Sequence, residues 1–339
     1  MELLTRDNFR EKCLARDNNK CVICGSENSP CVHHIVERRL FEDGGYRCAN
    51  GATVCPQCHI KAEQTLVTVE ELRNAIHATE KCVPKDFYYD EQIDKWGNSI
   101  LPNGMRMRGQ LFDDASVYKI LEPVHHLFTK YVKYPKTCHL PWSPGIKEDD
   151  RVLDDDSIFH GQEVIVSIKH DGENTSIYND YVHARSIDSR DHVSRHWIKN
   201  FQYRIGYNIP DGWRLCGENM WAKHSIYYDN LPSYFLGFSM WNEKNVCLSW
   251  KETMEWFELL EVTPVEVFYT GIYDKEKIIE EFNSKYNLET SEGYVVRLEK
   301  EFSYKEFAKS IAKYVRKGHV QDHGFWMSRI TPNKLMKKE

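Results

Sequence analysis

The stretch VIVSIKHDGENTSIY, residues 164–178, alternates apolar and polar side chains and then places a lysine directly before His-Asp-Gly. This alternation predicts a half-buried β-strand that ends near Lys169. An uncharged lysine amine can act as a nucleophile and form a covalent intermediate. Because a free lysine has a pKa of about 10.4, its surroundings must favour the neutral form by about 4 kcal/mol. We expect apolar strand walls and nearby cations to do so, although a lone strand lysine is more often a solvated charge.

A second group of reactive side chains lies near the N-terminus, where eight of the eleven cysteines fall at or before Cys82. Two Cys-x-x-Cys pairs, CVIC and CPQC, have spacings that suit one tetrahedral Zn²⁺ better than a disulfide framework. The predicted structural zinc ligands are Cys21, Cys24, Cys55 and Cys58. The remaining cysteines of this region are expected to be small buried residues, namely Cys13, Cys31, Cys48 and Cys82.

Histidines stand among these cysteines, in VHHIVERRLFEDGG, NGATVC and CHIKAE. Residues 13–65 resemble the HNH endonuclease family, which has the ββα-metal fold. The resemblance implies that His33 and His59 bind a divalent catalytic metal, that His34 activates water, and that Asn50 fixes the hairpin. Glu63 follows His59 by four residues on a predicted helix, so both side chains can reach one Mg²⁺ or Mn²⁺ ion. The alternative is a zinc ribbon that binds nucleic acid without cleaving it.

KHDG at 169–172 is followed in order by HARS (183–186), LCGEN (215–219), YFLGFSMW (234–241), EGYVVR (292–297) and AKYVRK (312–317). With KYPKTCHLPWSPG (133–145), the series resembles the covalent nucleotidyltransferase superfamily of ATP-dependent RNA and DNA ligases and mRNA capping enzymes. It is most similar to a branch of bacterial and phage RNA ligases, over about residues 115–328. Six ordered blocks are far more specific than KHDG alone.

The resemblance implies that Lys169 accepts AMP from ATP as a phosphoramide. Asp171 and Gly172 would shape the turn beside it, with glycine allowing backbone that other residues avoid. Glu292 would bind the metal or hold the lysine, and Lys313 would touch the α-phosphate.

Further matching residues would bind the rest of the substrates. Arg185 would grip the 5′-phosphate or the nucleotide, Glu218 would take the ribose hydroxyls, and Phe238 would stack on adenine. Arg316 and Lys317 would add positive charge, although many relatives have Lys-x-Lys here and the second cationic partner stays open. Relatives also often carry an acidic residue where Ile168 stands, which moves adenine recognition elsewhere.

The implied reaction joins 5′-phosphate and 3′-hydroxyl ends through an adenylylated lysine and an adenylylated 5′ end, with Mg²⁺ or Mn²⁺ neutralising phosphate charge. DNA ligases and capping enzymes carry an OB-fold after the last block. Only 22 residues follow Lys317 here, which favours RNA ends, in a nicked duplex or a tRNA, as partners. The alternatives are a DNA ligase, a protein that is mainly an HNH nuclease of DNA or RNA, and a non-catalytic nucleic-acid binder.

The composition of the chain limits the classes of protein to which these sites can belong. The chain has 339 residues, 41% hydrophobic and 28% charged, with a net charge of −6, so it is not a generic polyanion binder. No apolar run suits a membrane span or a signal peptide, and we expect a cytoplasmic protein. The basic C-terminal stretch, with Phe325 and Trp326, could contact single-stranded ends, whereas the acidic run at 148–156 is expected to be a solvated loop.

The predicted fold class is α+β, with a nucleotidyltransferase domain built on antiparallel sheets after a small zinc-binding ββα-metal domain. The predicted boundaries are 1–83 for the HNH-like domain, 84–114 for a linker, 115–330 for the ligase domain and 331–339 for a basic tail. Thr68 and Glu71 predict a capped helix over 68–78. Helical spacing is also expected at 115–132 and 303–312.

Overall fold

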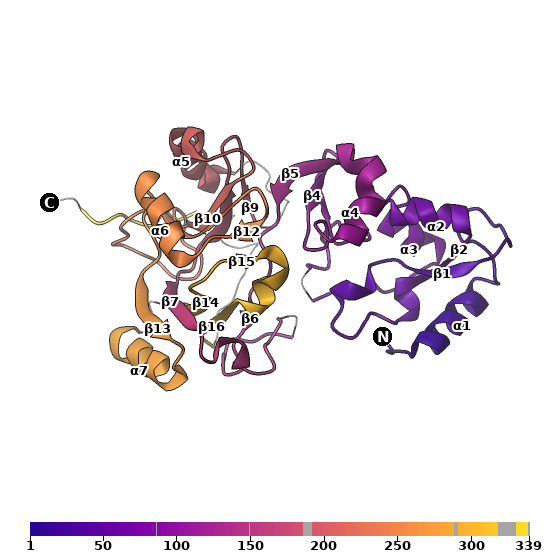
Figure 1. The fold of residues 1–339 in the computed structure, drawn as a ribbon, viewed down its shortest axis with the longest axis horizontal. Helices are drawn as coiled ribbons and strands as arrows, with labels where there is room; N and C mark the ends of the chain where they lie inside the picture. The colour runs from indigo at the N-terminus through magenta and orange to yellow at the C-terminus, as the bar shows by residue number, and fades with distance from the viewer. Residues whose placement is uncertain (86, 149, 186–191, 288–290, 318–329, 338–339) are drawn as a thin grey trace. The chain divides into compact units, whose positions relative to one another are not determined.

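The computed structural model describes residues 1–85, 87–148, 150–185, 192–287, 291–317 and 330–337. The chain forms two compact units, Met1–Lys133 (unit 1) and Tyr134–Glu339 (unit 2), and each has sheets and apolar cores of its own (Figure 1). Within the described ranges, no helix combines the length and the apolar character that crossing a membrane requires.

Unit 1 is built around a two-stranded antiparallel hairpin. Its elements are α1 (Arg6–Arg16), β1 (Cys31–His34), β2 (Gly51–Val54), α2 (Pro56–Glu63), α3 (Val69–Ala75), β3 (Ser99–Ile100), β4 (Arg106–Arg108), α4 (Ala115–Leu121) and β5 (Phe128–Val132). The hairpin contacts α1 and α2, which appear beside it in indigo in Figure 1. Helix α3 begins at the predicted capping box, because Thr68 Oγ1 accepts from Glu71 N at 3.1 Å and Thr68 N donates to Glu71 Oε2 at 2.6 Å.

The stretch 84–114 is not a linker, which corrects the predicted boundary. Trp96 Nε1 donates to the carbonyl of Glu63 at 2.7 Å, and Arg106 Nη2 donates to the carbonyl of Thr65 at 3.0 Å. Ile93 belongs to the same apolar cluster as the β1–β2 hairpin. The turn-rich composition suggested a connector, but these anchoring side chains fold the stretch into unit 1, which ends at Lys133.

One predicted helix is shorter than expected, and another is replaced by a 3₁₀ turn and a strand. Over 115–132, α4 ends at Leu121, and a 3₁₀ turn at Glu122–Leu127 leads into β5. Pro123 lacks the amide hydrogen that a continuing α-helix would use. Over 303–312, a 3₁₀ turn at Tyr304–Lys309 precedes a strand at Ile311–Val315, because pairing with a neighbouring strand overrides the local helical pattern.

Unit 2 contains two sheets. Its strands are β6 (Cys138–His139), β7 (Glu163–Lys169), β8 (Glu173–Ile177), β9 (Val182–Ala184), β10 (Arg214–Asn219), β11 (Phe235–Trp241), β12 (Val246–Cys247), β13 (Val267–Ile272), β14 (Gly293–Leu298), β15 (Phe302–Ser303) and β16 (Ile311–Val315). Its α-helices are α5 (His196–Ile205), α6 (Trp250–Leu259) and α7 (Lys275–Lys285). One sheet has the order β15-β12-β11-β10-β8-β9, and the other has the order β13-β7-β14-β16-β6.

Among the named strands of unit 2, the pairing is antiparallel except between β16 and β6, so the mixed architecture agrees with the predicted α+β class. Alternate residues of β7, namely Val164, Val166 and Ile168, enter a core that α7 also lines. Lys169 is therefore left on the opposite face of its sheet. The predicted strand thus forms, and its polar face is the one that carries the site.

Candidate active site and metal centres

Lys169 ends β7, and Gly293 at the start of β14 lies directly opposite it in the antiparallel register. The residue before that glycine, Glu292, is almost fully buried, with a side chain 3% exposed, whereas that of Lys169 is 20% exposed. Lys169 Nζ donates a short hydrogen bond to Glu292 Oε2. Two residues that are 123 positions apart in the chain therefore form one ion pair at a strand end.

The charges around Lys169 are mainly negative. Burial disfavours its ammonium form, but the carboxylates of Glu292, Glu218 and Asp171 outweigh burial and raise the pKa of Lys169. The expectation of a lowered pKa is therefore wrong for this arrangement of side chains, because acidic groups rather than cations lie nearest to the amine. Lys169 is a charged ammonium here and must lose a proton before it can act as a nucleophile.

The pKa of Glu218 in β10 is also raised, which favours the neutral form of this carboxyl group. Burial raises the pKa of Glu218 to about 8, and the carboxylates of Glu292 and Asp171 add to this against the opposing charge of Lys169. A carboxyl group with this pKa can either donate or accept a hydrogen bond near neutral pH. Gly172 leaves room for it, because a Cβ there would lie 2.9 Å from Glu218 Cγ.

Asp171 is fixed by a neighbouring loop. Its Oδ2 accepts hydrogen bonds from Ser225 N at 2.7 Å, Ser225 Oγ at 2.6 Å and Ile226 N at 2.8 Å. Its own backbone N–H donates to Tyr228 Oη at 3.1 Å. These bonds hold the turn after Lys169 on both sides, as the predicted shaping role of Asp171 requires.

Lys313 lies in the same sheet as Lys169, two strands from β7. In the register, Ser167 faces Val295, Val295 faces Lys313, and Lys313 faces His139 of β6. These side chains share the face that carries Lys169. Burial and then the charge of Lys169 lower the pKa of Lys313 to about 8. Lys313 is thus close enough to Lys169 for the two charges to interact.

Asp150 and His139 belong to this cluster, although the sequence assigned neither a role. His139 Nε2 lies 3.2 Å from Asp150 Oδ2, and His139 Nδ1 lies 2.9 Å from Ser143 Oγ. Burial lowers the pKa of His139, whereas His139 and Lys313 hold the pKa of Asp150 far below its usual range despite burial. Asp150 is 13% exposed, so this part of the acidic run is not a solvated loop. In the sequence, the acidic run that contains Asp150 comes just after KYPKTCHLPWSPG, and this position is the signal that could have placed Asp150 near the site.

Other predicted residues of this site lie at its margin. Arg185 Nε donates to the carbonyl of Tyr134 at 3.3 Å, and the charge of Arg185 contributes to the lowered pKa of Lys313. Phe238 is partly buried and meets the ring of Tyr134 edge-on at 5.4 Å. The backbone N–H of Arg316 donates to the carbonyl of Glu292 at 2.9 Å.

Three further predicted residues are exposed or lie outside the described ranges. The side chain of Lys317 is exposed. The predicted stacking residues Phe325 and Trp326 lie outside the described residues. Adenine stacking on Phe238 and phosphate contacts by Arg185 stay predictions.

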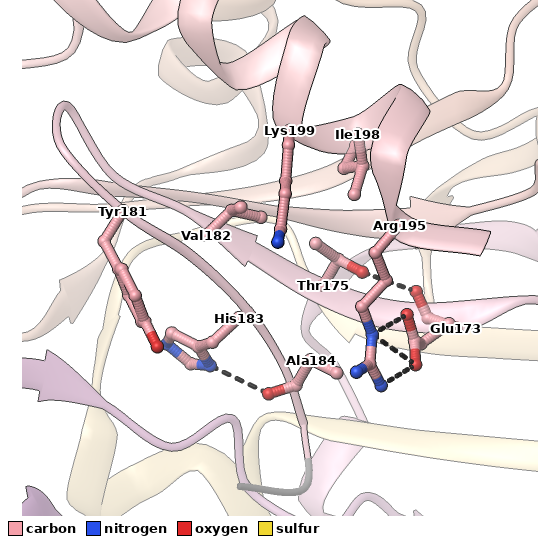
Figure 2. Close-up of a pocket in the computed structure, with 9 residues that line it drawn as sticks. All are labelled: Glu173, Thr175, Tyr181, Val182, His183, Ala184, Arg195, Ile198 and Lys199. Carbon is pink, nitrogen blue, oxygen red and sulfur yellow. Dashed lines mark hydrogen bonds and ion pairs between the residues drawn. The ribbon is translucent and has the colours of Figure 1, made fainter. Parts of the chain in front are cut away.

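A small pocket opens between the β8–β9 hairpin and α5, and Figure 2 shows its lining. The lining residues are Glu173, Thr175, Tyr181, Val182, His183, Ala184, Arg195, Ile198 and Lys199. Glu173 and Arg195 form an ion pair in it, with Arg195 Nη2 at 2.5 Å and Nε at 2.9 Å from the carboxylate oxygens. Lys169 is not among the lining residues, so this pocket is distinct from the lysine site.

The four predicted zinc ligands in unit 1 come together. The sulfur atoms of Cys21, Cys24, Cys55 and Cys58 all lie within 4.8 Å of one another. Cys24 Sγ and Cys55 Sγ are 3.7 Å apart. A tetrahedral site with Zn–S bonds of about 2.3 Å requires sulfur–sulfur distances of about 3.8 Å. The donor set and its spacing therefore fit a structural Zn²⁺ ion.

A second ligand group joins β1 to α2. Glu63 Oε1 lies 3.3 Å from His33 Nδ1 and 3.1 Å from His59 Nε2. Lys95 Nζ approaches the same oxygen at 3.0 Å. The two imidazoles and one carboxylate suit a divalent cation that accepts nitrogen and oxygen ligands. Cys31 Sγ lies 3.2 Å from His59 Nδ1 and can orient that ring.

His34 points to the other side of β1 from His33, because side chains alternate along a strand. Its ring stacks on Phe9 at 4.7 Å and meets Tyr46 edge-on at 5.2 Å. Burial and the charge of Lys95 lower the pKa of His34 to about 4. The structure thus groups the predicted metal ligands but does not place His34 beside them.

Asn50 has the hairpin-fixing contacts that were predicted for it. Its Oδ1 accepts from Val36 N at 2.9 Å, and its Nδ2 donates to the carbonyls of Val36 at 3.0 Å and Gly45 at 3.2 Å. Asn50 is 1% exposed, so these bonds lie in the interior of unit 1.

The part of the chain around Lys169 is similar to known proteins. Residues 162–315 match the family model described as RNA ligase, whereas no curated protein matches the chain. A putative ATP-dependent DNA ligase from Aquifex aeolicus is 23% identical, with a TM-score of 0.33 and coverage of 46% of this chain and 44% of that one. An archaeal ATP-dependent RNA ligase is 16% identical, with a TM-score of 0.38 and coverage of 55% and 48%.

A Naegleria gruberi RNA ligase with pyrophosphate is 18% identical, with a TM-score of 0.34 and coverage of 47% of this chain and 51% of that one. The chain thus spans about half the length of the solved structures that it matches. Unit 2 contains an RNA ligase-like domain, and residues 1–161 lie outside the family match.

Proposed function

We propose that unit 2 is an ATP-dependent RNA ligase that seals 5′-phosphate and 3′-hydroxyl ends through AMP bound covalently to Lys169. The observation that carries this proposal is the Lys169–Glu292 ion pair at the end of β7, with Glu218, Asp171 and Lys313 around it. This cluster lies within an RNA ligase-like domain. A buried lysine among titratable groups whose pKa values are displaced is typical of a reactive site.

The proposed first step forms a bond between Lys169 Nζ and the α-phosphorus of ATP. The bond from that phosphorus to the bridging oxygen breaks, and pyrophosphate leaves with the electron pair. Glu292 is hydrogen-bonded to Nζ and is therefore placed to accept the proton that the ammonium must lose. Lys313 would stabilise negative charge on the phosphates. Mg²⁺ or Mn²⁺, held by carboxylates such as Glu292, would neutralise phosphate charge.

The later steps would reuse the same residues. The adenylyl group passes to a 5′-phosphate, which restores the amine of Lys169. A 3′-hydroxyl then attacks that phosphate and AMP leaves. We propose that Arg185 holds the 5′-phosphate, that Phe238 stacks on adenine, and that Arg316 and Lys317 add positive charge near RNA ends.

Incubation with ATP labelled at the α-phosphate tests the first step. Label should remain on the denatured wild-type chain in the presence of Mg²⁺ or Mn²⁺ and should be absent from Lys169→Ala. Lys285→Ala is a matched control, because Lys285 is an exposed lysine of α7 that pairs with Glu281 four residues earlier. Label on Lys169→Ala, or no label on the wild type with either metal, would contradict the proposal.

Matched RNA and DNA substrates test the choice of nucleic acid. RNA strands with a 5′-phosphate and a 3′-hydroxyl, presented as a nick or as a broken stem-loop, should be sealed faster than DNA of the same sequence. Preferential sealing of the DNA nick would make the protein a DNA ligase instead.

A second proposed function belongs to unit 1. The grouping of His33, His59 and Glu63 supports a metal-dependent nuclease of the HNH type, for DNA or RNA. These residues would hold the ion, which would stabilise charge on a scissile phosphate. Such cleavage would leave the 5′-phosphate and 3′-hydroxyl ends that a ligase joins. His34 is proposed as the base, although its stacking on Phe9 means that the ring would have to turn toward the ion.

Nicking assays with Mg²⁺ and Mn²⁺ test this second function. His59→Ala should abolish nicking while lysyl-AMP formation persists, and His34→Ala should do the same if His34 is the base. Retained nicking in His34→Ala would remove His34 from the mechanism but keep the metal site. Absence of nicking in the wild type would favour a zinc-stabilised module that binds nucleic acid without cleaving it.

A further inference from the structure

Residues 331–336, which were expected to be part of a basic tail, are bound to the loop formed by residues 220–231. Backbone hydrogen bonds join Lys223 N to the carbonyl of Thr331 at 2.8 Å, Lys334 N to that of Tyr228 at 2.9 Å, and Leu231 N to that of Lys334 at 2.9 Å. Isolated bridges place Pro332 beside Ala222 and Leu335 beside Leu231. The segment therefore runs along both ends of this loop.

Asn333 is the most deeply buried residue of this segment, at 1% exposure. Its Nδ2 donates to the carbonyl of Met220 at 2.7 Å, and its Oδ1 accepts from Tyr228 N at 3.0 Å. Its backbone N–H donates to the carbonyl of Trp221 at 2.9 Å, and its carbonyl accepts from Tyr234 Oη at 3.0 Å. One side chain thus joins the start of the loop to its end.

The middle of the same loop holds the turn beside Lys169. Ser225 and Ile226 donate to the carboxylate of Asp171, and Tyr228 Oη accepts from the backbone N–H of Asp171. The chain of contacts runs from Asn333 through Tyr228 to Asp171, two residues after the nucleophile. All of these groups lie in unit 2.

We propose that Asn333 is a positioning residue for lysine adenylylation. It would set the shape of the 220–231 loop so that Ser225 and Ile226 hold Asp171, and thereby Lys169, in line for attack on ATP. This inference rests on the proposed ligase function. Small displacements of a nucleophile reduce rates by large factors, so the loss of Asn333 should fall mainly on the step in which Lys169 attacks.

Step-specific assays on the full-length chain separate this role from a general loss of structure. Asn333→Ala should form lysyl-AMP at least about tenfold more slowly than the wild type, because the attacking amine is displaced. Joining of an RNA strand that already carries AMP on its 5′-phosphate does not need Lys169 as nucleophile, and it should fall by less than about threefold. Lys334→Ala is the matched control, because Lys334 is exposed and its hydrogen bonds to the loop are made by its backbone.

A measurement that does not depend on activity can test the role of Asn333 even if the ligase proposal is wrong. Amide hydrogen exchange at Ser225 and Ile226 should be faster in Asn333→Ala and unchanged in Lys334→Ala. If Asn333→Ala does not fold, Tyr228→Phe tests the same chain of contacts by removing the oxygen that accepts from Asp171. This variant should slow lysyl-AMP formation by about threefold, as for one lost hydrogen bond.

Three results would overturn the inference. They are lysyl-AMP formation in Asn333→Ala at the wild-type rate, an equal fall in both steps, and unchanged exchange at Ser225 and Ile226. Absence of lysyl-AMP in the wild type would reject the ligase proposal, while the exchange measurement would still decide whether Asn333 holds the loop.

Discussion

Lys169 and Lys313 lie on one face of one sheet, yet their surroundings shift their pKa values in opposite directions. Three carboxylates outweigh burial at Lys169 and raise its pKa, whereas burial and the neighbouring ammonium lower the pKa of Lys313 to about 8. The site therefore combines a lysine whose ammonium form is stabilised with a second lysine that can lose its charge at mildly alkaline pH. In the proposed adenylylation, the first must lose a proton and the second must keep one.

Asp150→Asn should shift the alkaline limit of lysyl-AMP formation to lower pH. A lysine is positive below its pKa, so phosphate binding by Lys313 weakens as pH rises through about 8. The carboxylate of Asp150 raises the pKa of Lys313, and its removal should lower the pH at which that charge is lost. The measurement is the pH profile of the rate at subsaturating ATP, which reports groups of the free enzyme.

The control for this prediction is Asp154→Asn, because Asp154 is an exposed residue of the same acidic run. Its profile should match that of the wild type. An identical alkaline limb in Asp150→Asn and the wild type would show that Asp150 does not act on Lys313.

The resemblance of the ordered blocks pointed to Lys169 and Glu292, which the structure brings together, but it did not point to the contacts of His139, Asp150 or Asn333. His139 reaches Lys313 only because β6 pairs with β16 in parallel, 174 residues further along the chain. A parallel pairing between strands so far apart in the chain produces no recognisable pattern in the local sequence.

Among the secondary-structure elements, the pairing of β7, β14 and β16 positions the site. Gly293 pairs with both Lys169 and Val315, and a Cβ at Gly293 would lie 1.9 Å from the carbonyl oxygen of Tyr314. Its φ of +153° is also a conformation that L-residues rarely adopt. Glycine is required here because the backbone of the adjacent strand leaves no room for a side chain.

Gly293→Ala should destabilise unit 2 by about 3 kcal/mol and reduce lysyl-AMP formation, because β14 and β16 must separate to admit the methyl group. Gly271→Ala in β13 is the matched control, since Gly271 has a similar φ of +143° but no atom nearer than 3.9 Å to the added Cβ. The control should lose only about 1 kcal/mol, the cost of the backbone conformation. Urea unfolding measures both values, and equal losses would exclude the clash as the cause.

Strand β7 was expected to end near Lys169, and it does end at this residue. The helix expected at 303–312, in contrast, was wrong. Ser303 and Glu306 do form a capping box, but it starts only a 3₁₀ turn. The following residues, Ile311–Val315, gain more by pairing with β14 than by extending that turn.

The whole chain combines a cysteine-rich unit and a ligase-like unit, and the sequence predicted this order but not the boundary. Composition changes near Cys82, which suggested a linker at 84–114. The structure places the division between Lys133 and Tyr134, because scattered anchors such as Trp96 fold that stretch into unit 1. A few buried side chains in a turn-rich stretch have little effect on its composition, so composition alone cannot locate such a boundary.

Removal of zinc should unfold unit 1 and leave lysyl-AMP formation intact, because every residue proposed for that step lies in unit 2. Cys58→Ala removes one of four sulfur ligands, and a structural Zn²⁺ site contributes folding free energy directly. The variant should bind less zinc, measured by release to a chromogenic chelator, and unit 1 should melt at a lower temperature. The rate of lysyl-AMP formation should stay within about twofold of the wild type, since none of the residues proposed for that step lies in unit 1.

Cys82→Ala is the control for this experiment, because Cys82 is equally buried in unit 1 but lies outside the four-sulfur cluster. It should keep a full zinc equivalent and lose only the packing of one sulfur atom. Full zinc content in Cys58→Ala would reject the metal site. A parallel fall of zinc content and lysyl-AMP formation would instead mean that unit 1 supports the chemistry of unit 2.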